Sequence, residues 1–172
     1  MKNLDSPDSI HAPISQNLLL KMEPQRNKIL GDIATLLERG DIEDKIDREL
    51  VVKAVAFIEN PTEDLSDITS HTTIIGQALT TMQEAPSEIV AMYSYFFALQ
   101  CINRINFVEE KLSQETPADS PEIRKAMSRG LDWATTLSIG HNDHISLITA
   151  FHELQARLNS LQNPQLLHTT QF

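Results

Sequence analysis

The chain has 172 residues, enough for one domain with a sizeable core, and its composition (41% apolar, 22% charged) excludes wholesale disorder. Its formal net charge of −10 argues against nucleic acid and anionic membranes as partners, because both are bound through clustered basic residues. Five glycines and eight prolines leave long periodic segments, which favours helices over strands.

Residues 1–14 have no apolar periodicity, and we expect them to form a flexible N-terminal arm. Ser15 can cap a short turn. Pro24 suits the first position of a new helix, where the missing N–H of proline costs nothing. That helix is expected to end at Gly40, since glycine readily adopts the left-handed conformation that follows many helices.

Acidic residues are concentrated between residues 41 and 67, which contain nine acids and three bases. We expect Asp41 to cap a helix that starts near residue 42 and ends before Pro61. The acids around the helix start predict a solvated face, and the alternative is a surface for a basic partner. This acidic surface consists of Asp41, Glu43, Asp44 and Asp47.

The following helix, which Thr62 can cap, has the most regular pattern in the chain, with apolar residues at alternating steps of three and four. Such a narrow seam is typical of coiled coils. It covers fewer than three heptads and is interrupted by Thr72, so it predicts packing inside a bundle, with a partner or dimer surface as the alternative. That possible surface consists of Leu65, Ile68, Ile75, Leu79 and Met82, together with Trp133 on the flank of a later helix.

Residues 87–112 predict the central helix. Its stretch from Ile89 to Ile102, IVAMYSYFFALQCI, has only Ser94 and Gln100 outside the apolar set, so no polar stripe runs along it. A helix that is apolar on every side is a buried helix, and this stretch is shorter than the roughly 20 residues needed to cross a bilayer. The single cysteine, Cys101, lies in this stretch, and we expect it to be inert.

Ser120 and Pro121 predict the start of the next helix, in which Gly130 indicates a close helix crossing, and a last helix begins near Asp143. The sequence therefore predicts an all-α fold: a compact single-domain bundle of about six helices over residues 15–163, with a buried central helix at 87–112 and a C-terminal tail at 164–172. The predicted helices start near residues 24, 42, 63, 87, 121 and 143.

Several side chains were considered for chemistry. His144 and His152 are eight residues apart, or about 12 Å along a helix, too far to share one metal ion. Asp67 and His71 lie one helical turn apart but lack a nucleophile, and we expect a pH-sensitive surface pair. His144 and His152 belong to a histidine cluster that consists of His141, Asp143, His144 and His152.

No phosphate-binding loop, paired-cysteine motif or zinc-protease motif occurs in the sequence. We therefore expect no catalytic residue, no metal and no cofactor. An aromatic cluster in the central helix is expected to pack in the core, and the alternative is the lining of a ligand pocket. The cluster consists of Tyr93, Tyr95, Phe96 and Phe97.

These features favour a non-enzymatic protein–protein interaction module, an adaptor, chaperone-like or regulatory protein that binds another protein or a second copy of itself. One alternative is a secreted bacterial effector of helical fold, suggested by the polar residues at both ends of the chain; another is a small-ligand-binding protein or an enzyme. The N-terminal residues lack the apolar core of a Sec signal, which predicts a cytoplasmic location or export by a non-Sec route.

Overall fold

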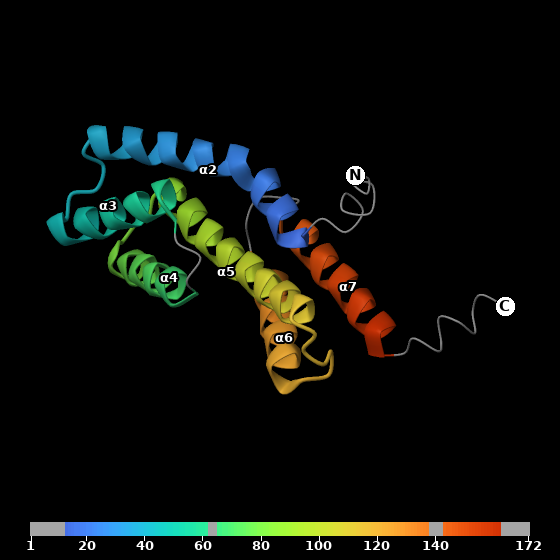
Figure 1. The fold of residues 1–172 in the computed structure, drawn as a ribbon. Coiled ribbons are helices and arrows are strands. Elements are labelled where there is room, and N and C mark those ends of the chain that lie inside the picture. Colours follow the sequence, from blue (N-terminus) through green and yellow to red (C-terminus); the bar gives the residue numbers. More distant parts are fainter. Residues whose placement is uncertain (1–12, 62–64, 138–142, 163–172) are drawn as a thin grey trace.

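The computed structural model describes residues 13–61, 65–137 and 143–162, and all regular structure within these ranges is helical. The prediction of an all-α bundle of about six helices is confirmed, and every helix after the first starts within three residues of its predicted position. The helices, shown in Figure 1, are α2 (Ile14–Glu38), α3 (Lys45–Glu59), α4 (Leu65–Thr81), α5 (Ser87–Ser113), α6 (Pro121–Thr136) and α7 (Asp143–Gln162).

The first helix is longer than the sequence predicts. Pro24 lies inside α2, and Ile14, which we assigned to the arm, is the first residue of the helix. A proline inside a helix removes one hydrogen bond and crowds the preceding turn, and Figure 1 shows α2 changing direction along its length. The helix continues because Met22 and Ile29, on either side of the proline, are both buried in the core. Residues 1–12 and the predicted tail at 164–172 lie outside the described residues.

The start of α3 also differs from the prediction. Asp44, and not Asp41, caps this helix, because its carboxylate accepts a hydrogen bond from the backbone N–H of Asp47 at 3.0 Å. An N-cap side chain must reach an N–H two or three residues further on, and Asp44 has that separation from Asp47. Ile42 precedes the helix and is nevertheless buried, so the residues between α2 and α3 pack against the core.

The other end of α3 is held by a side chain of α2. Arg26 donates to the backbone carbonyls of Ile58 and Glu59 at 3.1 and 3.2 Å. The last carbonyls of a helix have no partner within the helix, and α3 has no basic residue in its own last turn. Arg26 therefore joins α2 to the carboxyl end of α3.

The buried central helix is confirmed. Figure 1 shows α5 crossing the middle of the molecule, where it packs against α2, α4, α6 and α7. Phe96 is fully enclosed, Leu99 is buried and Phe97 is partly buried against the core, while Val90 near the start of the helix is exposed. The apolar stretch therefore forms the core of the bundle.

Two polar residues that interrupt the apolar patterns of α4 and α5 bind each other. The side-chain amide of Gln100 donates to the Thr72 hydroxyl at 2.8 Å, and that hydroxyl donates to the carbonyl of Ile68 at 2.7 Å. A buried polar group is tolerated where it has a hydrogen-bond partner. The contact therefore explains how both patterns can be interrupted inside the core.

The close helix crossing predicted at Gly130 is confirmed. A Cβ atom at this position would lie 2.3 Å from the ring of Phe151 in α7, which leaves no space for a side chain. On its α5 side, Cys101 places its sulfur 3.7 Å from the carbonyl oxygen of Gly130. Burial raises the pKa of Cys101 to about 12, so the thiol stays protonated and unreactive, as expected.

Candidate functional site

Most of the seam that was considered as a partner surface belongs to the core. Ile68 and Ile75 are buried, and Leu79 and Met82 are partly buried against the core, so the surface hypothesis is wrong for the first two residues. The reason is that the seam of α4 faces α5 and is covered by it. The side chain of Leu65 lies outside the described part of the structure.

The proposed acidic surface is also smaller than the sequence suggested. Asp47 is buried and accepts a hydrogen bond from the Thr81 hydroxyl of α4 at 3.1 Å, so it is not a surface residue. Asp44 caps α3, and Asp41 lies 3.7 Å from the guanidinium of Arg39. Together with Glu43, these two acids are exposed.

The histidine cluster can be followed only in part. His152 is exposed on α7, whereas His141 and the side chains of Asp143 and His144 lie outside the described residues. Within the described part of the chain, no group of three or more histidine, cysteine or acidic side chains could hold a metal ion.

His71 lies against aromatic rings instead of on an open surface. Its ring centroid is 4.5 Å from that of Phe57 and 6.2 Å from that of Phe96. Burial lowers the pKa of His71, the charge of Asp67 opposes this shift, and Lys53 adds to it. The buried Nδ1 atom has no hydrogen-bond partner within the described residues. Asp67 is exposed and acts on the pKa of His71, as expected for a pair one helical turn apart, but His71 is only partly exposed and also belongs to an aromatic cluster.

The aromatic residues of α5 point in different directions. Phe96 is in the core, and Tyr93 and Phe97 contact each other edge-on with centroids 5.0 Å apart. Tyr93 also covers Gly76 of α4, where a Cβ would be 3.2 Å from its ring. Tyr95 lines a groove on the other side of α5. Core packing is therefore observed for most of the cluster and pocket lining for one member.

This groove, of about 440 Å³, lies between the first half of α2 and the middle of α5. Two consecutive leucines stand on its α2 side, Leu19 with 46% and Leu20 with 67% of its surface exposed. The other lining residues are Ser15, Gln16, Glu23, Arg26, Pro61, Ile68, Tyr95, Leu99, Ile102, Asn103 and Asn106.

The sequence did not indicate the groove, because we expected only a short turn after Ser15 and a new helix from Pro24. A usable pattern was present. Ile14, Leu18 and Met22 recur at steps of four, which places one face of α2 in the core and leaves Leu19 and Leu20 beside it. This pattern becomes visible only if the helix is allowed to begin at Ile14, which we assigned to the arm.

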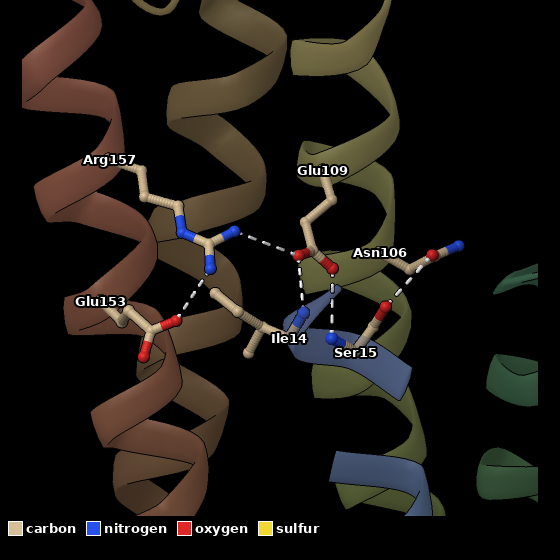
Figure 2. A network of polar contacts seen from close by, with 6 residues as sticks. All are labelled: Ile14, Ser15, Asn106, Glu109, Glu153 and Arg157. Carbon is tan, nitrogen blue, oxygen red and sulfur yellow. Dashed lines mark hydrogen bonds and ion pairs between the residues drawn. The ribbon is translucent and has the colours of Figure 1, made fainter. Parts of the chain in front are cut away.

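A polar network that holds the start of α2 lies at one end of the groove, where Ser15 and Asn106 line it. Pro13, the residue before the helix, provides no side-chain cap, and the carboxylate of Glu109 in α5 takes that role (Figure 2). It accepts hydrogen bonds from the backbone N–H groups of Ile14 and Ser15 at 2.7 and 3.1 Å. A carboxylate at a helix N-terminus satisfies free donors and interacts favourably with the helix dipole.

The same network reaches α7. Arg157 lies 3.6 Å from Glu109 and donates to Glu153 at 3.1 Å, so one guanidinium joins two carboxylates, as Figure 2 shows. The hydroxyl of Ser15 donates to Asn106 at 3.3 Å, and both residues line the groove. The network therefore fixes α2 relative to α5 and, with it, the width of the groove at this end.

Tyr95 provides a hydrogen-bonding group in the wall of the groove. Its side chain is only 4% exposed, and its hydroxyl makes no hydrogen bond with any residue in the described ranges. Burial raises the pKa of Tyr95, and the charge of Arg26 opposes this shift. The hydroxyl therefore stays protonated near neutral pH and can bind a ligand as a donor or an acceptor.

The residues around the groove are suited to binding. Its floor consists of apolar side chains, and its rim carries amides from α5 and one carboxylate, that of Glu23. Groove volume and lining fall within the range of ordinary ligand and peptide sites.

None of the described helices has the length and hydropathy needed to cross a membrane. Comparison with protein-family models, with curated proteins and with solved structures finds no match.

Proposed function

We propose that the protein is a non-enzymatic protein–protein interaction module, and that the groove between α2 and α5 receives an amphipathic helix of a partner protein. The exposure of Leu19 and Leu20 beside an apolar floor is the observation that carries this proposal. Full burial of a leucine side chain contributes about 1.5–3 kcal/mol, so a partner that covered both would gain useful affinity. In the free protein these two side chains face water.

A helical partner fits the groove better than an extended one. The walls are helices, whose backbone groups are already paired, so they offer no free strand edge to an extended peptide. A helix satisfies its own backbone and presents apolar side chains at steps of three and four. Along α2 the lining residues run from Ser15 to Arg26, which at about 1.5 Å per residue is a length of roughly 16 Å, or three helical turns.

Charge favours a partner with a basic outer face. The chain has a formal net charge of −10, and Glu23 stands at the rim of the groove. The opposite charge at the rim, that of Arg26, is directed to the carbonyls at the end of α3. A basic amphipathic helix would therefore approach faster and bind more tightly than an acidic one.

The test uses a fluorescently labelled model helix with leucines at steps of three and four and lysines elsewhere. Its binding to the full chain is followed by fluorescence anisotropy and compared with a scrambled peptide of the same composition. We expect saturable binding of the model helix, reduced at least about tenfold by Leu20→Glu, since loss of 1.4 kcal/mol lowers affinity by that factor. Ile46→Glu on α3 is the matched control, because Ile46 is 68% exposed and lies away from the groove lining.

Equal binding of the scrambled peptide, or equal loss in the two variants, would reject the groove as the binding site. Sedimentation of the protein alone provides a further outcome. If the chain forms dimers that Leu20→Glu disrupts, the occupant of the groove is a second copy and the proposal of a foreign helix is wrong.

A cytoplasmic location belongs to the same proposal. Its support is the single buried cysteine, which needs no oxidising compartment. Export by a non-Sec route is the alternative, and fractionation of the native host, with the tagged chain found in the medium, would favour it.

A further inference from the structure

A group of basic and aromatic side chains lies where α5 and α6 run side by side, away from the groove. The guanidinium of Arg104 in α5 stands over the ring of Trp133 in α6, 5.2 Å from its centroid. Further along, Lys111 stands 5.4 Å from the ring centroid of Phe107 and pairs with Glu122 of α6 at 3.4 Å. The two helices therefore share a face that carries positive charge in a protein of net charge −10.

A second arginine belongs to this face. Arg129 lies one helical turn before Trp133, so both side chains project from the same side of α6. Its positive charge and, above all, burial lower the pKa of Arg104. The positive charges of Arg104 and Arg129 repel each other, and this repulsion disfavours the charged form of Arg104.

Neither arginine is neutralised by the described part of the chain. Arg104 and Arg129 form no ion pair with a carboxylate in the described ranges. Of the acids of α6, Glu122 is paired with Lys111, and Asp132, three residues after Arg129, is exposed and forms no ion pair within the described residues. The Nε atom of Arg104 is buried and has no hydrogen-bond partner there either. A buried donor of a charged group that has no acceptor costs free energy. A ligand that supplied an acceptor to this arginine would therefore be favoured.

We propose that Arg104 and Arg129 form a binding site for a phosphoryl group, with Trp133 holding the Arg104 guanidinium in place. Arginine presents a planar set of donors that matches the oxygens of phosphate, and stacking on an aromatic ring orients that plane. Two unpaired arginines match the charge of a phosphate monoester, about −1.5 to −2 at neutral pH, better than the single charge of a carboxylate. Negative charge more than about 10 Å away is screened at 0.1 M salt. The acid beside the site along α6 is Asp132, next to Trp133, and the two arginines outnumber it.

The chain contains a built-in reporter for this site, since Trp133 is its single tryptophan. The full chain is titrated with inorganic phosphate at constant ionic strength, and Trp133 fluorescence is recorded. The NMR signal of the Arg104 Nε–H group, in protein with ¹⁵N-labelled arginine, provides a second readout that does not depend on the tryptophan. We expect a saturable change in both.

Arg129→Gln tests the site with little risk to the fold, because Arg129 is exposed. We expect it to weaken phosphate binding at least about tenfold, and Arg104→Gln to do the same. Arg124→Gln is the matched control. It removes the same charge from an exposed position on the same helix, five residues before Arg129 and thus on a different side, and is expected to leave binding unchanged.

Parallel titrations with phenyl phosphate and with a phosphoserine peptide distinguish the two sources of a phosphoryl group. Tighter binding of the peptide indicates a phosphorylated protein partner, and tighter binding of the small ester indicates a free metabolite. Acetate or glutamate binding as tightly as phosphate would overturn the assignment to phosphoryl groups. So would the absence of a saturable change in either readout, or equal losses in Arg129→Gln and Arg124→Gln.

Discussion

The imidazole of His71 illustrates how a single side chain links packing to pH. The ring lies against Phe57 and Phe96, and its Nδ1 atom is enclosed without a partner in the described residues. Protonation of the ring in this setting requires a charge to be placed among apolar groups, which burial disfavours. Folding and proton uptake at His71 therefore compete.

The sign of the pH effect follows from that competition. Burial lowers the pKa of His71 below its ordinary value of 6.5, so the folded protein binds this proton less readily than the unfolded chain. The stability associated with the neutral ring is complete above pH 6.5 and is lost as the pH falls below it. His71→Phe removes the titrating group while keeping an aromatic ring, and the variant should lose less free energy of unfolding than the parent protein below pH 6.5. Urea unfolding of both proteins on either side of pH 6.5 measures this, and equal losses would contradict the expectation.

The sequence predicted contacts between side chains that are close along the chain, but not contacts between residues of different helices. Asp67 and His71 are one turn apart, so their proximity was predictable, but the ring that covers His71 comes from Phe57 in another helix. Similarly, Thr72 and Gln100 were each recognised as interruptions of an apolar pattern. Their hydrogen bond spans 28 positions and could not be predicted from either pattern alone.

At the level of helices, the capping and termination rules predicted a helix end correctly where only one residue nearby could play that role. Ser120 caps α6, and Gly40 ends α2 in the left-handed conformation with a φ of 71°, as predicted. The start of α3 offered both Asp41 and Asp44, and the prediction of Asp41 as the cap was wrong. Pro24 misled the prediction for α2, because buried residues on both sides outweigh the local preference of proline.

The crossing at Gly130 leads to a prediction with an internal control. Gly130→Ala gains helix propensity but forces the enclosed Phe151 ring to move, and we expect a net loss of about 1–2 kcal/mol of stability. Gly31→Ala in α2 meets nothing within 4 Å and should stabilise the protein by about 0.5–1 kcal/mol. Urea unfolding compares the two variants with the parent, and a stabilising effect at both positions would show that the crossing is loose.

On the scale of the whole molecule, Glu109 connects three helices. Its side chain is only 12% exposed and accepts from the first two N–H groups of α2 while facing Arg157 of α7. Glu109→Ala leaves these donors without their acceptor, and hydrogen bonds to charged groups contribute about 1.5–3 kcal/mol each. We expect a loss of stability of about that size, with faster hydrogen exchange at the start of α2.

Glu110→Ala is the control for this experiment, since Glu110 is the neighbouring carboxylate on α5 and is exposed. Its removal should change stability by less than about 0.5 kcal/mol. If both variants behave alike, the loss in Glu109→Ala reflects the helix surface in general and not the capping of α2.

The arrangement of the bundle was predictable and the groove was not, for a physical reason. A buried helix shows itself in the composition of its own segment, and residues 87–112 could therefore be identified as the centre of the fold. The groove depends on how α2 and α5 lie against each other, with contacts such as that from Ser15 to Asn106 joining positions 91 apart. Local periodicity contains no information about such a separation.

The hydrogen bond between Thr72 and Gln100 has a consequence for the alignment of the bundle. Sliding α4 along α5 by one turn, about 5.4 Å, would exchange one isoleucine contact for another at little cost in apolar area. The same slide would leave the Gln100 amide and the Thr72 hydroxyl buried without a hydrogen-bond partner, each at a cost of about 1–3 kcal/mol. This one hydrogen bond therefore selects a single register of α4 against α5, among several that would bury similar apolar area.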